Sequence, residues 1–179
     1  MDGTQDIPMT ITRTTNLSQK DIKHCDFSFE IACELLPPYD DLSKIKTFPK
    51  PFVKSYGFEE DDFQNINGDK MLAVAKLADV VCGYVLVSKA WNNFAQIDDI
   101  AVDKKIRKSG LGCLLVREAI DWAKEQQLAG IRLETQSVNV SACHFYKKMG
   151  FEFGGFDKYL YAAIPDVKDE VALYWYYLI

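Results

Sequence analysis

The chain has 179 residues, of which 48% are hydrophobic and 26% charged, and its formal net charge is −5. These values are ordinary for a globular protein that buries a core, and the length predicts a single domain over residues 1–179. An acidic chain without an apolar run of ~20 residues excludes nucleic acid and a membrane as expected partners.

The first third of the chain shows few regular patterns. A short apolar alternation over residues 9–12 predicts a strand, and Ser18 followed by Asp21 predicts the start of a helix. A second helix is predicted over residues 29–36, because Pro37 and Pro38 would stop it there. Residues 37–69 have no clear period and are predicted to be loop with short helical pieces.

The pattern is sharper after Lys70. Two β-rich runs, 71–77 and 80–89, predict a hairpin, and residues 94–102 predict a third strand. Helical periodicity follows over 110–127, then a strand over 131–136 and a short helix over 139–149 that ends at Gly150. Two further strands are predicted at 158–163 and 171–178. This order predicts an α/β domain, in which helices pack on a mixed sheet.

The strand ending at Val102 leads into Arg107–Gly112, a turn that contains two glycines and opens an amphipathic helix. The first N–H groups of a helix have no intrahelical partner and the helix dipole favours an anion, so this turn predicts a pyrophosphate site. The Gly-Lys-Ser/Thr of a P-loop and the third glycine of a dinucleotide fingerprint are both missing. The alternative is a structural turn.

This turn resembles the coenzyme A signature of the GNAT acetyltransferase superfamily, and Asn139–Phe151 resembles that family's second motif. The resemblance implies a mixed, mostly antiparallel central sheet flanked by helices, with acetyl-CoA as cosubstrate. It implies that residues 70–179 form the acetyl-CoA-binding core and residues 1–69 a variable part on the substrate side. The residues expected at the cosubstrate are Ile100, Ala101 and Val102 at its pantetheine arm, Arg107, Lys108, Ser109, Gly110, Leu111 and Gly112 at its pyrophosphate, and Asn139, Ala142 and Tyr146.

The resemblance also implies catalytic roles. It places Tyr146 beside the thioester sulfur, where a phenol with an ordinary pKa of ~10 can protonate the leaving thiolate. The alternative for Tyr146 is packing on the apolar face of its helix. The attacking amine must lose a proton, and the candidate bases are Asp98 first, because related enzymes often carry an acid there, then Asp99 and Glu134. Neighbouring residues of a strand face opposite ways, so only one aspartate is expected to face the cleft.

Four stretches resemble the streptothricin acetyltransferases: residues 54–62, 89–102, 132–143 and 174–176. This resemblance implies that the acceptor is an amine on the β-lysine arm of a streptothricin, and that the reaction confers antibiotic resistance. Carboxylates would attract such a polycation and aromatic faces could hold it, although a solvated acidic loop and core packing are the alternatives. The residues expected at the substrate are Tyr39, Tyr56, Glu59, Glu60, Asp61, Asp62, Trp91, Asp98, Glu134 and Trp175.

The five cysteines include no CxxC pair and there are only two histidines, so we expect no metal site. No apolar segment follows Met1, and this, with the unpaired cysteines, predicts a reduced cytoplasmic protein. Three other functions stay open. They are N-acetylation of an aminoglycoside or polyamine, N-acetylation of a protein amine, and binding of acyl-CoA without turnover. The sequence also leaves open whether the chain forms a homodimer.

Overall fold

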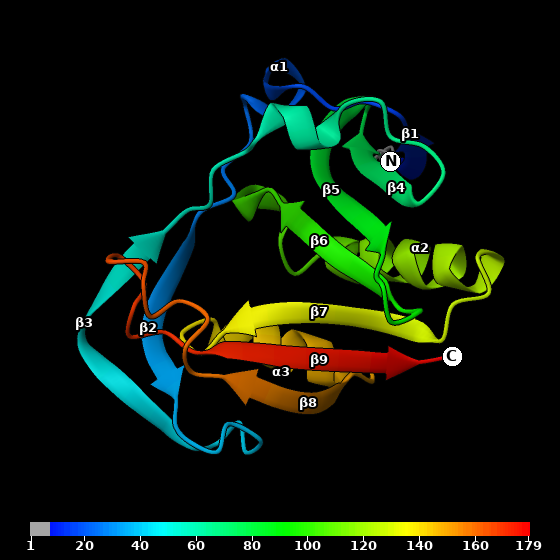
Figure 1. Ribbon diagram of the computed structural model, residues 1–179. Coiled ribbons are helices and arrows are strands. Elements are labelled where there is room, and N and C mark those ends of the chain that lie inside the picture. The colour runs from blue at the N-terminus through cyan, green and yellow to red at the C-terminus, as the bar shows by residue number, and fades with distance from the viewer. Residues whose placement is uncertain (1–7) are drawn as a thin grey trace, which may run out of the picture.

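The computed structural model describes residues 8–179, so the polar stretch directly after Met1 lies outside the described residues. The chain forms a seven-stranded sheet in the order β1-β4-β5-β6-β7-β9-β8 and a two-stranded sheet β2-β3 (Figure 1). The strands are β1 Met9–Thr14, β2 Phe29–Leu35, β3 Ile45–Lys54, β4 Lys70–Leu77, β5 Val80–Lys89, β6 Ala95–Val102, β7 Gly130–Gln136, β8 Glu152–Asp157 and β9 Ala172–Leu178. The helices are α1 Gln19–Ile22, α2 Leu111–Glu125 and α3 Val140–Lys148, with short 3-10 turns η1 Glu60–Phe63 and η2 Lys104–Ile106.

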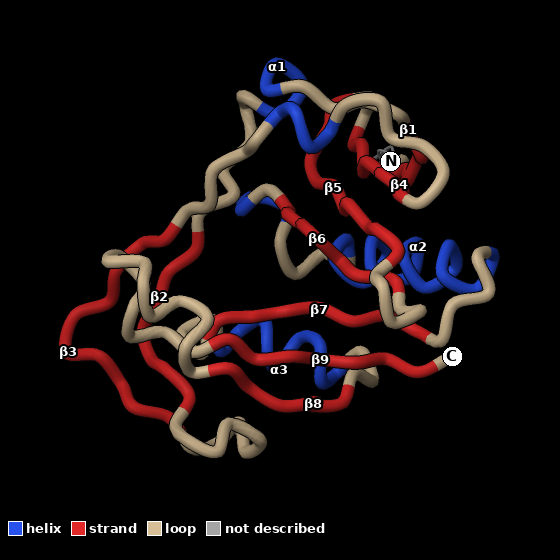
Figure 2. The backbone as a smooth tube through the Cα atoms, viewed as in Figure 1, coloured by secondary structure: helices blue, strands red, loops and turns tan. Residues whose placement is uncertain are grey.

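The large sheet is antiparallel except between β6 and β7, which confirms the expected mixed, mostly antiparallel sheet. In the described part of the chain these two parallel strands pair only at Ala95 with Ile131 and at Gln96 with Arg132. Beyond Gln96 they separate toward their C-terminal ends (Figure 2). The edge of β6 that faces β7 therefore keeps backbone groups without a strand partner.

The two faces of the sheet are covered by different parts of the chain. On one face α2 packs across β4 to β7 through an apolar stripe that includes Leu111, Leu115 and Ala119, as the helical periodicity predicted. On the other face α1 and η1 cover β4 and β5, where Phe63 and Tyr84 are buried. No helix within residues 8–179 is long and apolar enough to cross a bilayer.

The helix predicted over residues 29–36 was wrong, because this segment is strand β2. Only Ile31 and Leu35 are buried in it, and their spacing of four residues fits one face of a strand as well as one face of a helix. Its partner is β3, which lies in the region predicted to be loop. Pro49 and Pro51 hide β3 in the sequence, yet both are tolerated because β3 is an edge strand.

The strand predicted at 158–163 was also wrong, since residues 158–169 form a series of turns. The strand lies earlier, at β8, which pairs with β9. Gly154 and Gly155 obscure it in the sequence. A Cβ at Gly154 would lie 2.5 Å from the ring of Tyr176, so any larger residue at this strand position would displace that ring.

Candidate active site

The start of α2 offers an anion-binding site. Gly110 caps the helix in a left-handed conformation with φ 89°, and the space where its Cβ would lie is open. The N–H of Leu114 donates to the Gly110 carbonyl, so the N–H groups of residues 111–113 have no helical partner. Free N–H groups and the helix dipole suit a pyrophosphate, and the residues present fit that group.

The side chain of Arg107 holds this turn in place. Its Nε donates to the Val102 carbonyl at 3.1 Å and its Nη1 donates to the Ser28 carbonyl at 2.7 Å. These bonds join the turn to the end of β6 and to the segment before β2. The guanidinium is therefore occupied by the protein, and the turn offers an anion its backbone.

The two predicted motifs meet in space. A Cβ at Gly112 would lie 3.3 Å from the Phe145 ring, so the first turn of α2 lies against α3. Asn139 caps α3, since its Oδ1 accepts a hydrogen bond from the Ala142 N–H at 3.2 Å. The glycine turn and the Asn139–Phe151 motif are thus parts of one site.

Tyr146 lies on the face of α3 that packs against the core. It is 6% exposed, and its ring packs against Phe145 and Phe151 with centroid distances of 5.0 and 5.3 Å. Burial raises the pKa of its phenol, and the charges of Cys143 and Asp99 raise it further. The hydroxyl therefore keeps its proton at neutral pH, as a general acid must.

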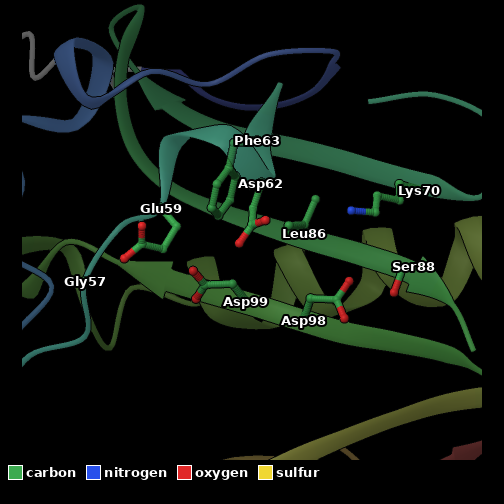
Figure 3. A pocket seen from close by; sticks show the side chains of 9 residues that line it. All are labelled: Gly57, Glu59, Asp62, Phe63, Lys70, Leu86, Ser88, Asp98 and Asp99. Carbon is green, nitrogen blue, oxygen red and sulfur yellow. The ribbon is translucent and has the colours of Figure 1, made fainter. Parts of the chain in front are cut away.

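A β-bulge turns both aspartates of β6 to one side. Leu86 pairs with Asp99 and Val87 pairs with Ile97, so Asp98 is the extra residue. The prediction that the two carboxylates face opposite ways was therefore wrong, because a bulge breaks the alternation of a strand. Both line the same cavity (Figure 3).

This cavity has a volume of about 410 Å³ and is strongly acidic. Its lining consists of Gly57, Glu59, Asp62, Phe63, Lys70, Leu86, Ser88, Asp98 and Asp99. Desolvation raises the pKa of Asp98 and of Asp99, although Asp98 is open to solvent on one side. The Tyr84 hydroxyl donates to Asp99 at 3.0 Å and opposes the shift. Four carboxylates face one lysine, which is an environment for a cation.

A second cluster of polar side chains is centred on Glu134 and Gln136 of β7, the strand that separates from β6. Tyr161 donates a hydrogen bond to Glu134, and Tyr56 donates one to Gln136. Sequence analysis missed Tyr161, because it assigned that segment to a strand and the residue belongs to no motif. Residues 55–63, here called the strap, carry Tyr56 as well as Glu59 and Asp62 of the cavity.

Several residues predicted at the substrate lie elsewhere. Trp91 is 94% exposed in the turn between β5 and β6, at the end of β6 away from Asp98. Trp175 is 1% exposed and donates to the Thr135 hydroxyl at 3.0 Å, and Tyr39 is buried against Phe156. The structure brings none of these three aromatic rings to the cavity, and core packing accounts for two of them.

Of the three acidic residues of η1, only Asp62 lines the cavity. Glu60 accepts a hydrogen bond from the Gln19 N–H at 2.8 Å, which ties η1 to the start of α1. Asp61 is exposed and does not line the cavity, unlike Asp62. Among residues 8–179 no group of three or more His, Cys, Asp or Glu side chains is placed to hold a metal ion.

Comparison with known proteins gives consistent matches. The acetyltransferase (GNAT) family matches residues 38–151. Streptothricin acetyltransferase A of Bacillus subtilis strain 168 is 36% identical over 171 residues, which are 93% of this chain and 98% of that protein. A protein described as a streptothricin acetyltransferase of Bacillus anthracis, solved in complex with acetyl coenzyme A, has a TM-score of 0.79 and 34% identity, covering 96% of this chain and 100% of its own. Nourseothricin acetyltransferase has a TM-score of 0.77 and 26% identity, covering 95% and 98%.

Proposed function

Because the chain belongs to the GNAT acetyltransferase family and is an acetyl-CoA-dependent N-acetyltransferase, we propose that it acetylates an amine on the β-lysine arm of a streptothricin. The observation that carries this proposal is the acidic cavity lined by the strap and by β4, β5 and β6. A streptothricin is a polycation, and this cavity offers four carboxylates to it. Acetylation would remove one of its charges, and we propose that the enzyme confers resistance in this way in the cytoplasm.

The cosubstrate side of the proposed site is made mainly of backbone. Residues 100–102 hold the pantetheine arm along the free edge of β6, and the N–H groups at Gly110, Leu111 and Gly112 hold the pyrophosphate. Acetyl-CoA supplies the acetyl group as a thioester. The backbone N–H near Val102 polarises the thioester carbonyl, as preorganised donors do where negative charge develops.

The proton transfers fall to side chains on opposite faces of the sheet. A carboxylate of β6, Asp98 first and Asp99 second, takes the proton of the attacking amine. Tyr146 gives its proton to the leaving thiolate. Both aspartates have a raised pKa, which brings a carboxylate closer to the value a general base needs near neutral pH.

The acceptor side combines the strap with strands of the large sheet. The strap supplies Glu59 and Asp62 to the cavity and Tyr56 beside it, and β6 supplies both aspartates. We propose that residues 1–69 select the acceptor while residues 70–179 bind acetyl-CoA. Variation in the strap would then change the acceptor without changing cosubstrate affinity.

The test is release of the CoA thiol with acetyl-CoA and a streptothricin mixture. An aminoglycoside, a polyamine and a lysine-rich peptide serve as comparison acceptors. Release with streptothricin, at a kcat/KM well above that with the others, supports the proposal. Release only with another acceptor assigns a different substrate, and tight acetyl-CoA binding without release from any amine indicates a binding protein.

A further inference from the structure

Glu134 on β7 is a carboxylate without an ion pair in the described part of the chain. Glu170, by contrast, is held by Lys54 at 2.6 Å. Arg132 lies two residues before Glu134 on β7. Its guanidinium donates to Gln96 at 2.9 Å and lies over the ring of Tyr174 at 5.4 Å. Glu134 is exposed, so its carboxylate is solvated in the free protein and is open to a cationic ligand.

The side chain of Glu134 is also held in one position. The Tyr161 hydroxyl donates to its Oε2, and the Gln136 amide donates to that hydroxyl at 3.4 Å. The Gln136 carbonyl in turn accepts from Tyr56, so β7, the strap and the turn at residue 161 share one network. Oε1 has no hydrogen-bond partner within residues 8–179. A carboxylate fixed in this way loses little conformational entropy when it binds a ligand.

Glu134 lies across the strand separation from the aspartate cavity. The Tyr56 hydroxyl donates to Gln136, two residues after Glu134 on β7, and the neighbouring Gly57 lines the aspartate cavity. Tyr56 therefore connects the two acidic groups. Burial raises the pKa of its phenol, and the charges of Glu170, Glu134 and Asp99 raise it further. An acceptor at the gap would meet carboxylates from β6 and from β7.

We propose that Glu134, positioned by Tyr161, binds a second ammonium group of the acceptor, while the amine to be acetylated lies beside Asp98 and Asp99. This inference rests on the proposed function, in that the acceptor is a cationic amine. The two acidic groups then have different roles. The β6 carboxylates accept a proton and Glu134 keeps its charge paired with an ammonium, so the preferred acceptor is a diamine.

The test compares 3,6-diaminohexanamide, which has both amines of a β-lysine arm, with 3-aminohexanamide and 6-aminohexanamide, which have one each. We expect the wild-type kcat/KM for the diamine to exceed both others by about tenfold or more, the worth of one charged hydrogen bond. Glu134→Gln should raise the KM for the diamine by a similar factor and leave its kcat nearly unchanged. Tyr161→Phe should raise that KM by a smaller factor, because the carboxylate stays but is no longer held.

Two matched controls separate these effects from general damage. Tyr159→Phe alters an exposed tyrosine of the same turn, and Glu152→Gln removes an exposed charge on β8. Both should keep the wild-type preference, and thermal melting checks that all variants fold. Equal kcat/KM for the three amines in the wild type would overturn the inference. So would a loss of kcat with all three in Glu134→Gln, which would identify this residue as the base.

A binding measurement makes the result independent of turnover. Calorimetric titration of 3,6-diaminohexanamide onto the CoA-bound protein should show an affinity about tenfold lower in Glu134→Gln than in the wild type. Equal affinities would refute the ammonium site even if streptothricin is a substrate. A clear difference would support it even if streptothricin itself releases no CoA, in which case only the proposed substrate fails.

Discussion

Replacing Tyr146 by phenylalanine removes a single oxygen from a packed site. The ring stays between Phe145 and Phe151, so no cavity forms, and the hydroxyl makes no hydrogen bond within residues 8–179 whose loss would cost stability. We expect the free energy of unfolding to change by less than about 1 kcal/mol. The kcat should fall by about 10²–10⁴, the usual contribution of a general acid.

The assay is CoA thiol release under saturating acetyl-CoA, with urea unfolding of the same preparations. The KM for acetyl-CoA should change little, because the phenol acts on the leaving sulfur after binding. A single-turnover experiment establishes whether chemistry limits the rate. If the chemical step keeps the wild-type rate constant in Tyr146→Phe, the acid role is refuted, and a large loss of stability would refute the packing argument.

Three further predictions concern the proton acceptor, the Lys54–Glu170 ion pair and the glycine turn. Desolvation raises the pKa of Asp98 and Asp99, so kcat/KM should fall as the pH drops through a value above the ordinary ~3.9. Of the variants Asp98→Asn and Asp99→Asn, only the one that replaces the base should lose this fall at low pH. The side chain of Glu170 is 11% exposed, and Lys54→Met leaves its carboxylate without a partner. We expect this variant to be less stable by roughly 3 kcal/mol in urea unfolding. Adding Glu170→Gln to the same chain should restore much of this loss. Gly110→Ala forces a left-handed φ on a residue with a Cβ, at a cost of about 1–2 kcal/mol, and should raise the KM for acetyl-CoA; an unchanged KM would mean that the turn does not hold the pyrophosphate.

The elements around the glycine turn could be predicted because their signals are local. The glycine turn, the apolar stripe of α2 and the short helix after Asn139 each lie within a few residues, and the structure has these elements as expected. The acidic cavity and the Glu134 network depend on contacts between distant segments. Tyr161 reaches Glu134 from 27 residues away, and the bulge at Asp98 is defined by its register with β5, which sequence periodicity does not contain.

In the proposed reaction the acid and the base act from opposite faces of the sheet. Tyr146 packs on the face that α2 also covers, and Asp99 lies on the face that carries Tyr84. Burial raises the pKa of Tyr146, and the charges of Cys143 and Asp99 raise it further. An amine beside the aspartates would approach the thioester from one face of the sheet, while the phenol would protonate the leaving thiolate from the other. The bulge at Asp98 completes this arrangement, because it turns a second carboxylate to the acceptor side.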